Sequence, residues 1–220
     1  MVLIGSESST TVVCVLVLFH PEMEVLGTIQ RLSLHYPIVL VVNAASTEFL
    51  ARLQGSAQIH LLRNERNIGL ASALNCGAEY AFGELGASFI ALFDQDSIPE
   101  ETMPGALAQE LGDSDGRIAC IGPYLVDKKA MTSTYATNLQ QVSGARSIPT
   151  SGTVIPRDVF FDVGPMLDSL FIDGIDHEWC FRACNKGYQV LVSSRTQMVH
   201  DMGDGALSYF GRYKPIHRSP

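Results

Sequence analysis

The stretch SFIALFDQDSIPE, residues 88–100, places two carboxylates, Asp94 and Asp96, directly after a run of apolar residues. An unbroken apolar run is typical of a strand that is buried on both faces of a sheet. In an extended chain residues i and i+2 point to the same side, so both carboxylates can reach one ligand. Oxygen ligands of this kind suit Mg²⁺ or Mn²⁺ bound to substrate phosphates. We therefore predict a strand over residues 88–96 that ends in a metal site; a turn with exposed acids is the alternative.

Three further apolar runs precede this strand, and each is followed by a segment with helical spacing. The predicted strands cover residues 12–19, 38–46 and 59–64, and the predicted helices cover residues 23–35, 47–55 and 69–84. Strands that alternate with helices in this way form βαβ units and a parallel sheet, so the fold class is α/β. Right-handed crossovers bring the carboxyl ends of such strands to one edge, where ligands bind.

Polar side chains stand at or just beyond the ends of these predicted strands. They are His20, Asn43, Arg63, Asp94 and Asp96. Because the strand ends share one edge of the sheet, we expect these five residues to converge there. This convergence is the first indication of a functional site.

The second half of the chain has shorter strand-like runs that are punctuated by glycine and proline. We predict strands of a more antiparallel kind within residues 118–125 and 147–164, then a helix over 176–187 and a strand over 188–194. A loop is predicted at residues 197–204. The two halves are expected to form one domain.

Composition narrows the class of protein. The chain has 220 residues, of which 46% are hydrophobic and 17% charged, as in a globular protein with a sizeable core. The net charge is −8, without the basic stripe typical of nucleic-acid binders, so we expect no nucleic-acid partner. A weak basic cluster, Arg212, Lys214 and Arg218, fits a solvated tail or a contact with anionic lipid or phosphate. Residues 1–10 are expected to form a loose tail.

The cysteines and the first apolar run bear on the compartment. The chain has 5 cysteines without a C-x-x-C pair, so we expect buried, reduced thiols rather than a disulfide framework. The apolar run at residues 11–19 is too short to cross a bilayer and lacks the basic segment of a signal peptide. These features predict a protein of the reducing cytosol.

A second acidic cluster surrounds the start of the helix that is predicted from Asp176. Asp173, Asp176 and Glu178 lie near its N-terminus, where negative charge is favourable. Capping of the helix is therefore an alternative to a chemical role for Asp176. An ordinary i,i+4 ion pair with Arg182 accounts equally for Glu178.

Three other residues have both a structural and a functional interpretation. Trp179, the only tryptophan, fits a core anchor or an aromatic face against which a sugar ring stacks. His200 follows a strand in a glycine-containing segment, a position compatible with metal ligation, although a single histidine is usually structural. Gly152 would let the backbone approach a ligand closely, or would simply form a turn.

Taken together, these segments resemble the glycosyltransferases of family 2, and within it the bacterial rhamnosyltransferases of polysaccharide biosynthesis. The resemblance runs from about residue 12 to 205 and is carried by VLVLFHP, VVNAAS, NERNIGLASALNCG, LFDQDS, SGTVIPRDVFFDVGPM, LFIDGIDHEWCFRACNKGY and MVHDMGD. The D-x-D pair alone is weak, whereas the whole series, in this order and spacing, is specific.

The resemblance implies the GT-A fold, a mostly parallel central sheet flanked by helices with a smaller acceptor-side part. A nucleotide-sugar-binding half would cover about residues 11–125, an acceptor and catalytic half about 126–205, and a C-terminal tail 206–220. The implied activity is a metal-dependent, inverting transfer of a sugar from a nucleoside diphosphate donor of the dTDP or UDP type. The implied sugar is L-rhamnose, with dTDP-rhamnose as its donor. The acceptor would be a hydroxyl of a saccharide or lipid-linked saccharide, in the cytoplasm or at the inner face of the cell membrane.

The resemblance also implies roles for individual residues. Asp94 and Asp96 fall on the D-x-D pair that holds the donor diphosphate through Mg²⁺ or Mn²⁺, and His200 completes that site. Asp176 falls on the general base that acts on the acceptor hydroxyl. The donor contacts would come from His20, Asn43, Arg63, Asn67, Gly69, Asn75 and Asp94. The acceptor contacts would come from Gly152, Glu178 and Trp179.

The chain departs from the family pattern at the second strand, and two other functions are open. Asn43 stands where the family usually has an aspartate that contacts the base, so an amide rather than a carboxylate would face a uracil or thymine. A catalytically inactive nucleotide-sugar-binding scaffold would share the fold. A haloacid-dehalogenase-type phosphatase also has an apolar strand before D-x-D, but that pattern requires Thr or Val where this chain has Ile98.

Overall fold

The computed structural model describes residues 11–53, 56–114, 116–127, 145–200, 207–209 and 212–214. The strands are β1 (Val12–Phe19), β2 (Ile38–Ala44), β3 (Ile59–Arg63), β4 (Phe89–Asp94), β5 (Ile118–Asp127), β6 (Val154–Pro156), β7 (Gln189–His200), β8 (Leu207–Tyr209) and β9 (Arg212–Lys214). The helices are α1 (Val25–Ser33), α2 (Thr47–Arg52), α3 (Leu70–Gly83), α4 (Met103–Gly112), α5 (Arg157–Val163) and α6 (Ile175–Asn185), with a short 3-10 helix η1 (Asp168–Leu170).

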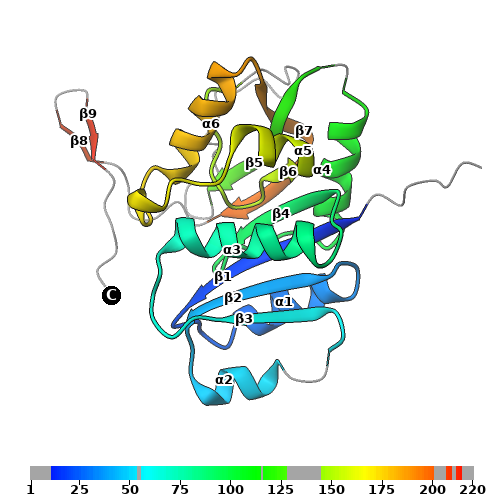
Figure 1. Ribbon diagram of the computed structural model, residues 1–220, viewed down its shortest axis with the longest axis vertical. Helices are drawn as coiled ribbons and strands as arrows, with labels where there is room; N and C mark the ends of the chain where they lie inside the picture. The colour runs from blue at the N-terminus through cyan, green and yellow to red at the C-terminus, as the bar shows by residue number, and fades with distance from the viewer. Residues whose placement is uncertain are drawn as a thin grey trace, which may run out of the picture.

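The first seven strands form one sheet in the order β3-β2-β1-β4-β6-β5-β7, and β8 pairs with β9 (Figure 1). Strands β1 to β4 are parallel to one another, and β5 is parallel to β7. Strand β6 is antiparallel to both of its neighbours, β4 and β5. The predicted parallel first half is therefore confirmed. In the seven-stranded sheet β6 supplies the antiparallel pairing expected of the second half, and β8 and β9 are also antiparallel to each other.

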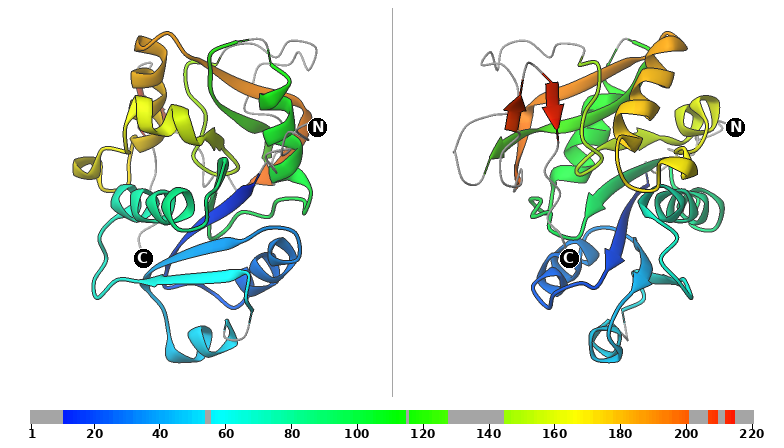
Figure 2. Two further views of the ribbon diagram at one scale, coloured as in Figure 1. Left: turned by 45° about the vertical axis from the view of Figure 1, so that its right-hand side comes forward. Right: turned by 90° about the vertical axis from the view of Figure 1, so that its left-hand side faces the viewer.

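Strand β1 supplies both hydrophobic cores, because residues 12–18 are all buried and alternate between the two faces of the sheet. One face carries Val13, Val15 and Val17 and is covered by α3, α5 and α6. The other carries Cys14, Leu16 and Leu18 and is covered by α1, α2 and α4. Helices on both faces of the sheet are visible in Figures 1 and 2. The result is the three-layer α/β arrangement that the sequence predicts.

The cysteines agree in part with the expectation of buried, reduced thiols. All five are free, and Cys14, Cys120 and Cys180 are buried, but Cys76 is exposed. Burial raises the pKa of the Cys14 thiol far above its usual range. Cys120 and Cys180 share a hydrogen bond that lowers the pKa of Cys180 and raises that of Cys120.

Two predictions for the second half are wrong. The sequence predicts strands within residues 147–164, whereas Arg157–Val163 is the helix α5. Its aromatic and β-branched residues are typical of strands, but Phe160 and Val163, three apart, share the buried side of a helix. The sequence predicts a loop from residue 197, whereas β7 continues to His200; residues 201–204 lie outside the described part.

The continuation of β7 has a local cause. Its pairing with β5 jumps from Gly122↔Val192 to Tyr124↔Gln197, so a bulge separates two paired stretches. The hydroxyl of Ser193 accepts hydrogen bonds from the backbone amides of Arg195 and Thr196 at 3.1 and 3.0 Å, which closes the bulge. The sequence also did not predict helix α4.

Helix α3 approaches the sheet most closely at Gly77. A Cβ at that position would lie 2.4 Å from Cγ1 of Val15 and 3.1 Å from Cγ2 of Val41. A Cβ at Gly83, on the same helix, would have nothing within 4 Å. The close packing of α3 on β1 and β2 therefore depends on a residue without a side chain at position 77.

We expect Gly77→Ala to lower the free energy of unfolding by about 1–3 kcal/mol, because the added methyl group overpacks the core. Gly83→Ala is the matched control and should stabilise by about 0.5–1 kcal/mol through helix propensity alone. Urea denaturation followed by circular dichroism measures both. Equal stabilisation by the two substitutions would contradict the packing described for α3.

Candidate functional site

A pocket of about 410 Å³ lies at the carboxyl edge of the sheet. The ends of β1, β2 and β4, the start of α3 and the segment after η1 contribute to it. It is lined by Val17, Phe19, Asn43, Asn67, Gly69, Leu70, Asp94, Gln95, Asp96, Phe171 and Ile172. The structure thus brings together Asn43, Asp94 and Asp96 as expected from the strand ends.

The D-x-D turn is held against the end of β1. Asp94 is the last residue of β4 and pairs with Val17, and the backbone amide of Phe19 donates to Oε1 of Gln95 at 2.9 Å. The amide of Ser97 donates to the carbonyl of Asp94 at 3.2 Å and closes the turn. Gln95, which the sequence interpretation passed over, is therefore the side chain that fixes the turn between the two carboxylates.

The end of β7 returns to this turn. Val199 forms an antiparallel bridge with Ile98, two residues beyond Asp96. The backbone of His200 therefore lies beside the D-x-D turn, as its predicted role requires. The side chain of His200 is outside the described part of the structure, so its role as a ligand stays a prediction.

The described side chains fit a divalent cation that a substrate helps to hold. Among them, no group of three or more His, Cys, Asp or Glu is arranged to bind a metal ion. Asp94 and Asp96 nevertheless line the same pocket with hard carboxylate oxygens. Mg²⁺ is commonly bound through one or two carboxylates together with substrate phosphates, so two carboxylates suffice for such a site.

At the other end of the pocket, Asn43 ties β2 to the start of α3. Its side chain is 4% exposed. Nδ2 donates to the carbonyl of Gly69 at 3.3 Å, and Oδ1 accepts from Nδ2 of Asn64 at 2.9 Å. The amide of Gly69 donates to Oδ1 of Asn67 at 2.9 Å. Asn43, Asn67 and Gly69 thus form one hydrogen-bonded end of the pocket, and their contact with a donor stays a prediction.

The segment after η1 closes this end of the pocket. The carbonyl of Phe171 accepts from the amides of Leu70 and Ala71 at 2.7 and 3.2 Å, so it caps the N-terminus of α3. A Cβ on Gly69 would lie 2.6 Å from Cδ2 of Phe171, so the ring lies directly over that glycine. Phe171 and Ile172 were missed by the sequence interpretation, although they lie inside the quoted segment LFIDGIDHEW.

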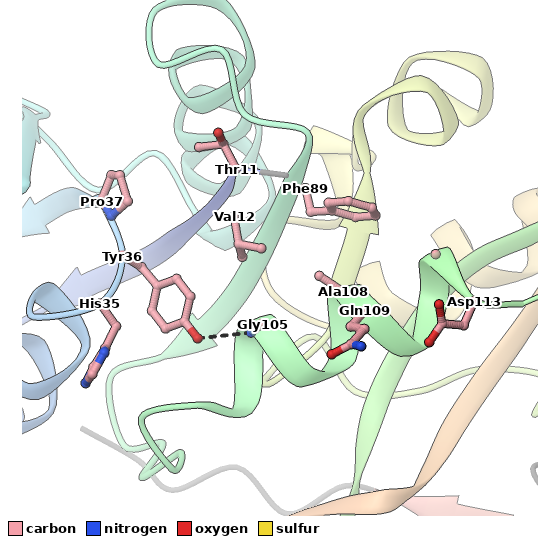
Figure 3. Close-up of a pocket in the computed structure, with 11 residues that line it drawn as sticks. Thr11, Val12, His35, Tyr36, Pro37, Phe89, Gly105, Ala108, Gln109 and Asp113 are labelled. Carbon is pink, nitrogen blue, oxygen red and sulfur yellow. Dashed lines mark hydrogen bonds between the residues drawn. The ribbon is translucent and has the colours of Figure 1, made fainter. Parts of the chain in front are cut away.

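Two other hollows lie away from these carboxylates. The larger, about 660 Å³, is at the opposite edge of the sheet beside α4, where the hydroxyl of Tyr36 accepts from the amide of Gly105 at 3.1 Å (Figure 3). Its one lining carboxylate is Asp113. The other, about 420 Å³, lies along the exposed side of α6 and includes His177 and Phe181. The paired carboxylates distinguish the pocket at the carboxyl edge as the candidate active site.

Comparison with known proteins assigns this arrangement to a family. The sequence profile of "Glycosyl transferase family 2" matches residues 27–164, more than half of the chain and including the D-x-D turn. The chain belongs to glycosyltransferase family 2. The family prediction made from the sequence is confirmed, and membership decides against the phosphatase alternative.

One similar curated protein is the "dTDP-rhamnosyl transferase RfbF" of Shigella flexneri. It is 29% identical over 225 residues, which cover 95% of this chain and 75% of RfbF. This similarity extends through both halves of the chain.

Solved structures of TarS from S. aureus share the fold at 10% sequence identity. The TM-score is 0.66 for the 1–349 chain and 0.63 for the same chain in complex with UDP, each over 87% of this chain. The chain spans 60% of those TarS chains and 36% of a longer one. These likenesses confirm the GT-A fold.

Three of the predicted donor residues of this family-2 chain, His20, Arg63 and Asn75, do not line the pocket. His20 and Arg63 lie at the same edge of the sheet, but both are exposed. The amide of His20 donates to the carbonyl of Ala44 at 2.8 Å, and Arg63 pairs with Val42. Their contact with a donor stays a prediction.

Asn75 has a structural role that the donor-side prediction did not anticipate. Its Nδ2 donates to the carbonyl of Met166 at 2.9 Å and to Oδ1 of Asp168 at 2.8 Å, while its Oδ1 accepts from the amide of Met166 at 2.8 Å. The side chain is buried, and it does not line the pocket. Asn75 therefore acts on the site indirectly, by anchoring the segment that leads to Phe171.

The acceptor-side prediction for Trp179 is wrong. The side chain is 1% exposed, and Nε1 donates to the carbonyl of Gly164 at 2.9 Å. A tryptophan in this position is a core anchor and has no face to offer a sugar ring. The apolar surroundings and the buried N–H partner explain why the only tryptophan is inside.

Glu178 and Gly152 are also engaged within the fold. Oε1 and Oε2 of Glu178 accept from Nε and an Nη of Arg182 at 2.7 and 2.8 Å, and Arg182 donates further to the carbonyls of Val163 and Pro165. Gly152 has φ +82°, and a Cβ there would lie 2.8 Å from the ring of Pro123. The i,i+4 pair and the turn, both left open by the sequence, describe these residues better than acceptor contacts.

Asp176 lies in the first turn of α6, where it was predicted. Its Oδ1 accepts from the amide of His177 at 2.8 Å, but the N-cap residue of the helix is Gly174. It does not line the donor-side pocket, but it follows Phe171 and Ile172, which do, by only a few residues. Its role as a general base stays a prediction.

By its sequence the apolar run at residues 11–19 is too short to cross a bilayer, and the helices can be judged by the same criterion. In the described ranges, none of the helices is both long and apolar enough to cross a bilayer.

Because Asn75 satisfies three polar groups of the segment before Phe171, Asn75→Ala should lower the free energy of unfolding by about 2–3 kcal/mol. The exposed Asn185 on α6 gives a control, Asn185→Ala, that should stay within about 0.5 kcal/mol of the wild type. Chemical denaturation followed by the fluorescence of buried Trp179 measures both. A neutral Asn75→Ala would contradict the anchoring role.

Proposed function

We propose that this family-2 glycosyltransferase transfers L-rhamnose from dTDP-rhamnose to a hydroxyl of a saccharide or lipid-linked saccharide, with inversion and with Mg²⁺ or Mn²⁺. The observation that carries the proposal is the pair Asp94 and Asp96 in one pocket at the carboxyl edge of the sheet. The activity named for RfbF supports the choice of sugar and nucleotide. The complex of TarS with UDP supports nucleotide binding by this fold.

Asp94 and Asp96 would hold the divalent cation beside the donor diphosphate. When bound, the cation supplies positive charge where the diphosphate gains negative charge as it leaves. Gln95 contributes by keeping the turn in place through its hydrogen bond with Phe19. Asn43, Asn67 and Gly69 would accommodate the nucleoside at the opposite end of the same pocket.

Asp176 would remove the proton from the acceptor hydroxyl as the oxygen attacks the anomeric carbon. The new C–O bond forms as the bond to the diphosphate breaks, and the proton goes to the carboxylate. One base without a covalent intermediate gives single displacement and therefore inversion.

We propose that the acceptor binds beside Asp176, on the exposed surface of α6. His177 and Phe181 stack there with ring centroids 6.4 Å apart, and Nδ1 of His177 is 2.7 Å from Oγ of Ser147. This exposed pair offers the flat aromatic surface that the sequence interpretation sought in Trp179. On this basis we still propose a nucleotide-sugar-binding first half and an acceptor-binding second half of the chain.

We expect Asp96→Asn to abolish the Mn²⁺-dependent part of nucleotide binding, because one of the two carboxylate ligands loses its charge. Titration calorimetry with dTDP, with and without Mn²⁺, measures the effect. Asp113→Asn, in the hollow at the opposite edge of the sheet, is the control and should bind as the wild type does. If dTDP binding by Asp96→Asn depends on Mn²⁺ as it does in the wild type, Asp96 is not a metal ligand.

Asp176→Asn should retain donor binding and reduce sugar transfer by about 10²–10⁴-fold, because the amide keeps the shape but cannot take the proton. Asp158→Asn, in the first turn of α5, neutralises a comparable helix N-terminal charge and should transfer normally. Release of dTDP from dTDP-rhamnose with a panel of octyl glycosides is the assay. Normal transfer by Asp176→Asn would place the base elsewhere, and donor binding without turnover by the wild type would favour the inactive scaffold.

A further inference from the structure

We propose that Leu70, Phe171 and Ile172 form an apolar wall that makes the donor pocket select thymine over uracil. The inference deepens the proposed function and rests on it, since it takes the pocket at the carboxyl edge to hold a nucleoside diphosphate. The three side chains come from the start of α3 and from the segment after η1. They line the same pocket as Asn43, Asn67 and Gly69.

The sheet order determines which end of the pocket receives the base. Strand β1 lies between β2 and β4, so the ends of β2 and β4 are two strand spacings, or about 10 Å, apart. With the diphosphate at Asp94 and Asp96, after β4, the base is directed toward Asn43, at the end of β2. The pocket continues from there to Asn67 and Gly69 at the start of α3.

Phe171 is attached to this base end and not to the diphosphate end. Its carbonyl accepts from the amides of Leu70 and Ala71, and its ring covers Gly69. It adopts φ +60°, a conformation that residues other than glycine rarely take. The two hydrogen bonds hold that conformation, so the ring has a defined place beside the base.

Phe171 and Ile172 have exposed apolar side chains that a bound ligand would cover. They are 47% and 55% exposed, although both line a pocket. Large apolar side chains that are exposed together within a pocket are typical of a ligand-contacting surface. Such a surface can stack on the face of either pyrimidine, so an effect on selectivity requires a separate explanation.

The chemistry of the two pyrimidines supplies that explanation. Uracil and thymine present the same hydrogen-bonding edge and differ by the methyl group on C5. The amides of Asn43 and Asn67 therefore have no means of distinguishing them. An apolar contact with the methyl group is the interaction that does, and the wall of Leu70, Phe171 and Ile172 is at the correct end of the pocket.

The pocket has two other apolar side chains, Val17 and Phe19, which come from the end of β1, between β2 and β4. Val17 pairs with Asp94, and the amide of Phe19 bonds Gln95 of the D-x-D turn. Phe19 also pairs with Ala44, beside Asn43. Nucleoside diphosphates that lack the transferred sugar separate binding of the base from binding of that sugar.

The experiment compares the dissociation constants of dTDP, dUDP and UDP for the full chain with Mn²⁺ by titration calorimetry. The first two nucleotides differ only in the methyl group, and the last two only in the 2′-hydroxyl. We expect dTDP to bind about 4- to 10-fold more tightly than dUDP, the effect of burying one methyl group. In Phe171→Ala and in Ile172→Ala this ratio should fall below about 2.

The control is Phe161→Ala, which removes a phenyl group of similar exposure, 56%, from α5 outside the pocket. It should leave the ratio of dTDP to dUDP at the wild-type value. Equal binding of dTDP and dUDP by the wild type, or a ratio preserved in both Phe171→Ala and Ile172→Ala, overturns the inference while nucleotide binding itself stands. If none of the three nucleotides binds, the proposed function fails and the inference fails with it.

Discussion

The structure depends on the parallel pairing of β1 with β2 on one side and β4 on the other. Because β1 is central and buried on both faces, helices must cover both sides of the sheet, and their crossovers return β1 to β4 in the same direction. The register then aligns Val17 with Asp94 and Phe19 with Ala44 at the carboxyl edge. The carboxylates, the Asn43 amide and the start of α3 meet there as a consequence of core packing, before any ligand is considered.

A second contact connects the two halves of the chain around this edge. The amide of Asn75 holds the backbone of Met166 and the carboxylate of Asp168, which are more than 90 residues later in the sequence. The same segment continues into Phe171, whose carbonyl caps α3. Helix α3 therefore receives both a side-chain clamp in its middle and a backbone cap at its start from one segment of the second half. The pocket is completed only by this docking.

The sequence predicts the first half well because each strand there is buried on both faces and appears as an apolar run. It predicts the second half less well for identifiable reasons. RDVFFDV has the composition of a strand, yet its buried residues have helical spacing. The burial of Trp179 depends on the carbonyl of Gly164, and the role of Asn75 depends on Met166. Partners that are distant in sequence leave no local pattern, so these side chains resembled ligand contacts until the fold was known.

The segment from Phe171 to Asp176 connects the two ends of the proposed reaction. Phe171 and Ile172 line the proposed donor pocket, and Asp176, four residues after Ile172, lies in the first turn of α6. The intervening Gly174 is in the left-handed region with φ +74°, which turns the chain from the pocket into the helix. A nucleotide that packs against Phe171 therefore contacts the segment that carries Asp176, the proposed general base. Backbone hydrogen bonds anchor this segment to α3 at Phe171. The proposed selection of the nucleotide base and the proposed catalytic carboxylate thus lie on one short stretch of chain.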